Sequence, residues 1–240
     1  MKVLTAKQLI NEYLNFFKEK GHTIIPSAPL VPEGDASTLF ISAGIQPFVP
    51  YFTGANHPAG KRLTSVQKCL RTEDLEGVGD KQRHTFFQML GNWSLGDYFK
   101  KESLSWSYEF ITKVLQIDPK ILHVTVFKGD DLVPFDTVAK ETWLSLGIPE
   151  ERIYAFGKEE NWWEVGEIGP GGPDSEIYID TGKEPCGENC NPSCRCGKYF
   201  EIWNNVFIEF YKNKNGSYTP LPKKNIDTGM GVERTIAILQ

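Results

Sequence analysis

The stretch 71–100, RTEDLEGVGDKQRHTFFQMLGNWSLGDYFK, constrains the fold of this chain more than any other. It predicts a strand, a polar turn at GVGDKQ and a second strand. The preceding TSVQKCL is rich in apolar and β-branched residues, whereas HTFFQMLGNW is too aromatic, and too short before its glycine, for a comfortable helix. The sequence therefore predicts a β-hairpin around which the rest of the chain is organised.

The same hairpin brings a cation close to an aromatic ring. Because side chains alternate between the two faces of a strand, Arg71 shares a face with Glu73, and Phe87 shares a face with Met89. A guanidinium binds phosphate oxygens and a flat ring stacks on a base, so this pattern predicts nucleotide binding. An ordinary hairpin with a surface arginine and core phenylalanines is the competing interpretation, and this stretch alone does not decide between them.

Length and composition set the broad class. A chain of 240 residues is long enough for one large core, and 40% hydrophobic with 24% charged residues is usual for a globular domain. The net charge of −5 argues against a nonspecific nucleic-acid coat but leaves room for a local RNA-binding patch. No apolar run approaches the roughly 18 residues of a membrane helix, and MKVLTAKQ lacks a signal-peptide core, so we expect a cytoplasmic protein.

The remaining elements alternate between helix and strand without a regular repeat. A Thr5–Gln8 capping box and Gly21 bound one helix. The other expected elements are an extended proline-bearing edge segment at 22–32, a strand from Ser37 that turns at Gly44, a helix at 101–115, a strand at 121–130 and a helix at 134–146. Hairpins rather than βαβ units favour an α+β fold, and the chain has no phosphate-binding glycine loop. Any nucleotide must therefore be held by side chains.

Four stretches occur in an order and spacing that identify a family: FISAGIQPF (40–48), RHTFFQMLGNWSLGDYFK (83–100), EIWNNVFIEF (201–210) and DTGMGVER (227–234). With them, nearly the whole chain resembles the N-terminal catalytic domain of the alanyl-tRNA synthetase family, which is class II. The resemblance implies an antiparallel sheet flanked by helices. It also implies ATP- and Mg²⁺-dependent activation of L-alanine to alanyl-adenylate, followed by transfer to the 3′ end of tRNA(Ala).

The resemblance assigns roles in ATP binding to residues of three motifs. Arg71 matches the catalytic arginine on the α-phosphate and the substrate carboxylate, and Arg234 matches the arginine that closes on the nucleotide from the opposite side. Phe87 matches the ring that stacks on adenine, with Phe86 as an alternative one position away. The other residues expected to contact ATP are Glu73, Arg83, His84, Met89 and Gly231.

The amino-acid site follows from the same resemblance. Asp227 matches the acid that pairs with the alanine ammonium, Trp163 the wall of the small pocket, and Asn204 a polar contact near the amino acid. Gly229 and Gly231 are expected at the start of the last helix, where they let the backbone approach the ligands. Glu201 is the candidate Mg²⁺ ligand.

Two features depart from the family pattern. Many members carry GPCGPCSEI, whereas this chain reads GPGGPDSEI, so Gly171 and Asp174 exclude a thiol role there. The insert 186–196 instead holds four cysteines spaced C-x₃-C-x₃-C-x-C: Cys186, Cys190, Cys194 and Cys196. They predict a structural Zn²⁺ knuckle or, with equal weight, free cytosolic thiols, and a disulfide is less favoured.

The resemblance also bounds the domain content. Residues 1–240 correspond to the alanine-activating domain and end just after the third motif, with the main tRNA-binding and editing domains outside them. We therefore expect adenylate formation with poor tRNA charging, and the oligomeric state stays open. Two other functions remain: an inert synthetase-like module that binds tRNA or protein, and a ligase that adenylates another small acid on the same fold.

Overall fold

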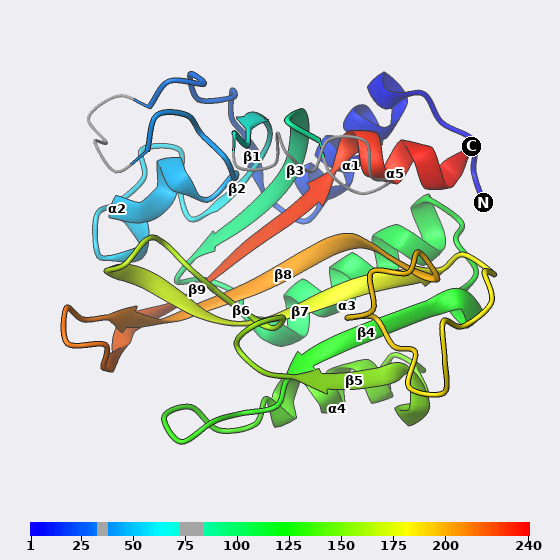
Figure 1. The fold of residues 1–240 in the computed structure, drawn as a ribbon. Helices are drawn as coiled ribbons and strands as arrows, with labels where there is room; N and C mark the ends of the chain where they lie inside the picture. Colours follow the sequence, from blue (N-terminus) through cyan, green and yellow to red (C-terminus); the bar gives the residue numbers. More distant parts are fainter. Residues whose placement is uncertain (33–37, 73–83) are drawn as a thin grey trace.

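The computed structural model describes residues 1–32, 38–72 and 84–240 (Figure 1). In this part of the chain a nine-stranded mixed sheet has the order β1-β2-β3-β9-β8-β7-β4-β5, and β6 pairs with β7. The strands are β1 (Thr23–Ile24), β2 (Arg62–Leu70), β3 (Phe86–Leu95), β4 (Leu122–Phe127), β5 (Ile153–Phe156), β6 (Trp162–Glu164), β7 (Gly169–Asp180), β8 (Tyr199–Lys212) and β9 (Tyr218–Gly231).

The helices of the described residues are shorter than the strands suggest and lie mostly around the sheet. They are α1 (Ala6–Glu19), α2 (Val49–Phe52), α3 (Lys100–Glu109), α4 (Thr137–Ser145) and α5 (Val232–Leu239). A π-helical turn (Phe110–Val114) extends α3, and short 3₁₀ turns lie at Gln46–Phe48, Pro119–Ile121 and Glu150–Arg152. The α+β prediction is confirmed, although β1 pairs with β2, and β4 with β5, in parallel.

The predicted hairpin is confirmed. β2 and β3 pair antiparallel in continuous register from Arg62↔Ser94 to Leu70↔Phe86. β3 also pairs antiparallel with β9, so the third motif lies beside the second in the centre of the sheet. The Thr5–Gln8 capping box at the start of α1 is present as well. Local patterning therefore sets these elements.

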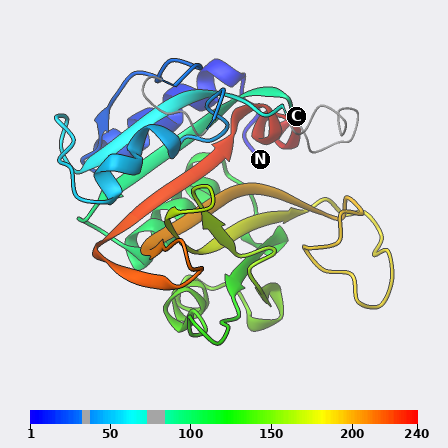
Figure 2. The ribbon, with the colours of Figure 1, turned by 60° about the vertical axis from the view of Figure 1, so that its left-hand side comes forward.

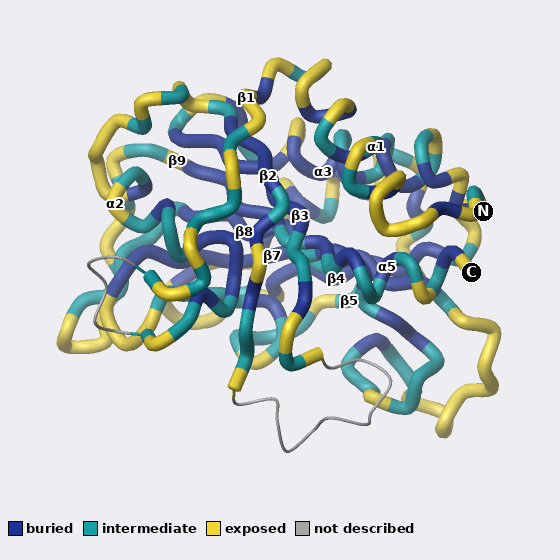
Figure 3. Tube along the Cα trace, turned by 90° about the horizontal axis from the view of Figure 1, so that it is seen from above, coloured by how far each residue is buried: buried dark blue, intermediate teal, exposed yellow. Residues whose placement is uncertain are grey.

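One face of the sheet carries the main core. The ring of Trp203 on β8 lies 5.5 Å from that of Tyr13 on α1 and 5.7 Å from that of Phe110 after α3, measured between centroids. α4 adds Trp143, which is also buried. Figure 1 shows α3 and α4 behind the sheet, and Figure 3 shows that the central strands are buried along most of their length.

The opposite face is covered by loops rather than by long helices. A second cluster packs Phe48 and Phe52 against Trp93 of β3 and Val206 of β8. The Phe48 and Trp93 rings stack with centroids 4.2 Å apart. This cover is incomplete, so the central strands border a cavity on this side.

Several predicted boundaries were wrong. The expected strand at 37–52 has no strand in its described part, because Pro47 and Pro50 stand at the first positions of a 3₁₀ turn and of α2, where the fixed φ of proline favours helix. DTGMG does not begin the last helix: β9 continues to Gly231, and α5 begins at Val232. Pairing with β3 and β8 extends the strand through both glycines.

No helix within the described residues has both the length and the apolar character needed to cross a membrane.

Candidate active site

The open face of the sheet holds a cavity of about 770 Å³. Its walls come from β3, β7, β8, β9, the start of α5 and the loop between β7 and β8 (Figure 2). The predicted site residues that line it are Arg71, His84, Phe87, Met89, Trp163, Glu201, Asn204, Asp227, Gly229, Gly231 and Arg234, together with Cys194 and Cys196. Stretches far apart in the sequence therefore converge on one cavity. Glu73 and Arg83 lie outside the described residues.

Arg71 lies at the end of β2 over the predicted aromatic ring. Its guanidinium carbon is 5.1 Å from the centroid of Phe87, and its Nε donates a 3.0 Å hydrogen bond to the carbonyl of Ser42. Phe87 is 8% exposed and lines the cavity, whereas the neighbouring Phe86 is 55% exposed and does not line it. Alternation along β3 thus separates the two phenylalanines, and only Phe87 faces a cavity ligand.

Arg234 enters the cavity from α5. Its guanidinium donates to Glu201 Oε2 at 2.6 Å and to the Glu201 carbonyl at 3.3 Å. The adjacent Glu233 accepts from the backbone N–H of Gln88 at 3.0 Å, which ties the start of α5 to β3. The two arginines are thus fixed to different elements of one sheet.

Asp227 is a buried acid on the cavity face of β9. Trp93 Nε1 donates a 2.6 Å hydrogen bond to Asp227 Oδ1. Burial raises the pKa of Asp227 from 3.8 to about 7, and the bond from Trp93 opposes this only partly. A cation placed beside this carboxyl would favour its ionised form.

Two glycines make room near this acid. A Cβ on Gly229 would lie 2.9 Å from Met89 Sδ, and a Cβ on Gly91 would lie 2.5 Å from the Trp93 ring. Larger residues would close the space between β3 and β9. The cavity is therefore narrow where Asp227 lines it.

A second group of carboxyls lies on β7 and β8. Asp174 accepts from Asn161 Nδ2 at 3.0 Å and from Asn204 Nδ2 at 3.3 Å, while Glu176 accepts from the Tyr178 hydroxyl at 2.6 Å. Burial raises the pKa of Asp174 to about 7. Burial, followed by the charge of Glu201, also raises the pKa of Glu176. This part of the cavity favours a bound cation.

The sequence analysis missed several residues that line the cavity. They are Ala43, Glu160, Glu176, Tyr178, Lys183, Arg195, Tyr199, Ile202, Val206 and Glu233, besides the residues of the loop next to Cys194. The alternation of Asp174, Glu176 and Tyr178 in GPDSEIYID was the signal for the β7 residues, since the three share one face of a strand.

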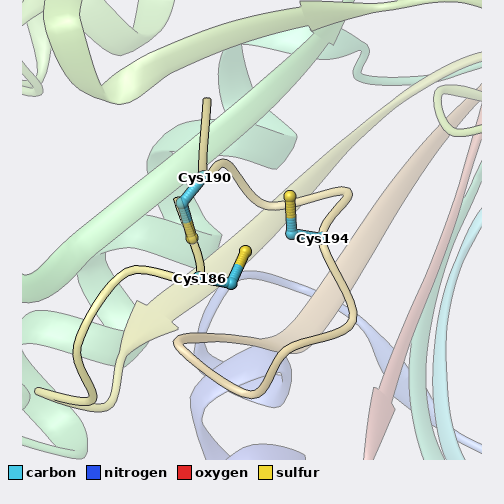
Figure 4. A group of neighbouring side chains, drawn as sticks. All are labelled: Cys186, Cys190 and Cys194. Carbon is cyan, nitrogen blue, oxygen red and sulfur yellow. The ribbon is translucent and has the colours of Figure 1, made fainter. Parts of the chain in front are cut away.

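The cysteine-rich insert forms part of the cavity wall. The sulfurs of Cys186, Cys190 and Cys194 lie within 4.8 Å of one another and point toward a common centre (Figure 4). Cys196 Sγ is 3.7 Å from Cys190 Sγ, which is too long for a disulfide bond. All four thiols are free, and residues 192–197 line the cavity. The insert is thus part of the site and not a separate appendage.

Comparison with known proteins defines the class. A family model described as tRNA synthetases class II (A) matches residues 8–240, and the chain belongs to this family. The apo histidyl-tRNA synthetase of S. aureus has the same fold, with a TM-score of 0.53 at 14% identity over 100% of this chain and 68% of the other. A threonyl-tRNA synthetase structure from Cryptosporidium parvum has a TM-score of 0.56 at 13% identity over 96% of this chain and 64% of the other.

Curated relatives narrow the comparison to one specificity. The chain is 56% identical over 242 residues to the alanine–tRNA ligase of Treponema denticola, covering 100% of this chain and 40% of that protein. It is 51% identical over 244 residues to the alanine–tRNA ligase of Alkaliphilus oremlandii, covering 100% of this chain and 27% of that protein. The chain therefore spans less than half the length of these relatives.

Proposed function

We propose that this chain activates L-alanine with ATP to form alanyl-adenylate, which is then transferred to the 3′ end of tRNA(Ala). One observation carries the proposal: Arg71, Phe87, Asp227 and Arg234, which come from three separate motifs, line a single cavity. The names of the relatives at 51–56% identity support alanine as the amino acid. An inert binding module would not need both arginines and a buried acid in one cavity.

The reaction joins a carboxylate oxygen of alanine to the α-phosphorus of ATP, and pyrophosphate leaves. Because little proton transfer is required, positioning and positive charge carry most of the rate acceleration. Arg71 would bind one oxygen of the α-phosphate and one of the alanine carboxylate, since its guanidinium offers two parallel donors. Arg234 would close on the nucleotide from α5, and Phe87 would stack on the adenine.

The remaining ATP contacts are proposals of the same kind. His84 and Arg83 would reach the outer phosphates, while Glu73, Met89 and Gly231 would border the nucleotide. Mg²⁺, when bound, would neutralise phosphate charge, and Glu201 is the ligand we propose for it. Glu201 lines the cavity and keeps a second carboxylate oxygen besides the one that accepts from Arg234, so the donor set suits the ion.

Alanine would bind through its ammonium and be limited by its methyl group. Asp227 would pair with the ammonium, Asn204 would add a polar contact, and Trp163 and Gly229 would wall the pocket. A pocket of this kind rejects glycine or serine only weakly, because one methyl or hydroxyl group is worth about 1–3 kcal/mol.

We also propose that the insert at 186–196 holds a structural Zn²⁺. Thiolates are preferred zinc ligands, and the clustered sulfurs of Cys186, Cys190, Cys194 and Cys196 suit a tetrahedral site after a small contraction. The bound ion would fix the loop that forms one wall of the cavity. Its role is structural, and no step of the reaction passes through it.

The partners of the complete protein follow from its relatives and stay proposals. Activation of alanine serves tRNA(Ala), but the chain matches only 40% of the Treponema denticola protein, so we expect poor tRNA charging by residues 1–240 alone. A cytoplasmic location, the 1–240 domain limits and the oligomeric state are not decided by the fold.

Amino-acid-dependent ATP–pyrophosphate exchange tests the proposed function. With Mg²⁺ supplied, exchange should be fastest with alanine and slower with serine and glycine. Faster exchange with serine, glycine or another small acid would favour the related-ligase alternative. No exchange in a folded sample would favour the inert module and contradict the proposal.

A further inference from the structure

A buried carboxyl behind the cavity wall holds two amides. Asp174 on β7 is 2% exposed and does not itself line the cavity. Its Oδ1 accepts from Asn161 Nδ2 at 3.0 Å, and its Oδ2 accepts from Asn204 Nδ2 at 3.3 Å. Its backbone N–H also donates to the Asn161 carbonyl at 3.1 Å, which fixes the two residues relative to each other.

The chemistry of an ionised carboxyl determines how both amides are oriented. A carboxylate only accepts hydrogen bonds, so each neighbouring amide must turn its NH₂ group toward Asp174. Asn161 is held further by a 2.6 Å bond from its Nδ2 to Thr125 Oγ1. The oxygen of the Asn204 amide is consequently directed away from Asp174.

Asn204 is left with a polar atom that lacks a partner. Its Oδ1 is buried and has no hydrogen-bond partner within the described residues. On the cavity face of β8, Asn204 stands opposite Glu176 of β7 and Gly229 of β9, and it lines the cavity. A buried acceptor without a partner is unfavourable, so the site is complete only when a ligand supplies a donor.

We propose that Asp174 is a positioning residue that fixes the Asn204 amide so that Asn204 Oδ1 accepts a hydrogen bond from the ammonium of the amino-acid substrate. This inference rests on the proposed function and adds a residue to its specificity. The ammonium has three donors, and Asp227 on β9 does not exhaust them. Asp174 acts through Asn204 and does not touch the substrate.

The replacement Asp174→Asn tests the orientation directly. An asparagine offers one acceptor and one donor, so it cannot accept from both amides, and one of them must turn. We expect the KM for alanine in pyrophosphate exchange to rise about tenfold, as for the loss of one hydrogen bond to a charged group, while kcat and the KM for ATP change little. Asp118→Asn makes the same chemical change outside the cavity and should alter neither KM.

An exchange of the two side chains should restore the site. In Asn161→Asp/Asp174→Asn the new carboxylate accepts from the amide at position 174, whose oxygen then accepts from Asn204 Nδ2. The total charge is unchanged, and the Thr125 hydroxyl remains beside position 161. The KM for alanine should return to within about threefold of the wild-type value.

A double-mutant cycle asks whether Asp174 acts through Asn204. Adding Asp174→Asn to Asn204→Ala should raise the KM for alanine no further, because the amide to be oriented is gone. Additive effects would overturn the proposal, as would an unchanged KM in Asp174→Asn or failure of the exchanged pair to recover in folded protein.

A second variant covers the case in which Asp174→Asn does not fold. Asp174→Cys has a weak acceptor and the same requirement for rescue, and it should show the same selective rise in the KM for alanine. An unchanged KM in this variant would also contradict the proposal. Wild-type exchange with alanine together with an unaffected variant defeats only this inference, whereas absence of wild-type exchange defeats the proposed function as well.

Discussion

The two faces of the central sheet are built from neighbouring residues and serve opposite purposes. On β8, Trp203 is completely buried among the rings of α1 and of the turn after α3, while the next residue, Asn204, lies on the cavity face with a buried acceptor that has no partner in the described residues. On β9, Ile226 and Met230 belong to the helix-covered core, and Asp227 between them lines the cavity.

This difference shows where the free energy of folding is gained and where it is lost. The helix-covered face buries apolar rings, which stabilises the fold. The cavity face buries carboxyls whose pKa values are raised to about 7 at Asp174 and Asp227, so their ionisation opposes folding in the absence of a ligand. The covered face thus supports a second face that is organised for binding.

The largest effect should come from breaking the covered face. Trp203→Ala removes a ring that packs against Tyr13, Phe17 and Phe110, and it should lower the free energy of unfolding by about 3–5 kcal/mol. Urea denaturation measures this loss. Asn204→Ala on the other face is the matched comparison and should cost much less stability while raising the KM for alanine. Equal losses at the two positions would remove the distinction between the faces.

Breaking the cavity face should abolish function and leave the fold. Arg71→Ala removes the guanidinium proposed to hold the α-phosphate, and it should slow pyrophosphate exchange by about 10²–10³-fold, or about 3–4 kcal/mol of transition-state stabilisation. The thermal midpoint should stay close to that of the wild type. Arg152→Ala, in which the lost guanidinium donates only to backbone carbonyls outside the cavity, should retain exchange. Wild-type exchange in Arg71→Ala would refute the role of this arginine.

A pH series should reveal the cost of the buried acid. Because folding raises the pKa of Asp227 from 3.8 to about 7, the unfolded state binds fewer protons between these values, and the stability of the unliganded protein should fall as pH rises from about 4 to about 7. The difference corresponds to at most about 4 kcal/mol. Asp174 and Glu176 shift in the same direction and add to the slope.

Asp227→Asn isolates the contribution of this acid. The variant keeps the acceptor for Trp93 Nε1 but carries no charge, so at pH 8 it should be about 2–3 kcal/mol more stable than the unliganded wild type while losing alanine-dependent exchange. Thermal unfolding at pH 5 and pH 8 measures the effect. A variant that is less stable than the wild type at pH 8 would show that the carboxylate is not strained by burial.

The smallest effect concerns the cysteine wall of the cavity. Cys190→Ser should lower bound zinc, measured on protein purified without chelator, from about one ion per chain toward none. Exchange should fall by roughly tenfold or less because the loop still covers the site, though less firmly. Ser193→Ala in the same loop should change neither value. Wild-type protein without zinc would contradict the metal proposal and favour free thiols.

Local patterns predicted some of this structure, and pairing between distant strands determined the rest. The hairpin of β2 and β3 and the capped helix α1 were predictable because alternation and capping are local properties. DTGMG looked like a helix start, yet pairing with β3 and β8 makes it strand, which no local signal reveals. The prolines and glycines of GPGGPDSEIYID likewise hide β7, although its residues are almost all buried.

The candidate site was predictable to the extent that motifs carried it. The four motif stretches pointed to Arg71, Phe87, Asp227 and Arg234, and the fold brings them to one cavity. Asp174 and Arg195 were not assigned to the site, because their places depend on the β7–β8 pairing and on the course of the loop between these strands. Their contribution is a property of the assembled sheet.

The most direct test of the account is a crystal structure of the chain with a non-hydrolysable alanyl-adenylate analogue. We predict that the ammonium contacts Asp227 and Asn204, that the phosphate-mimicking group contacts Arg71, and that the adenine lies on Phe87. An analogue bound elsewhere, or bound in the cavity with its ammonium away from Asp227, would contradict the account.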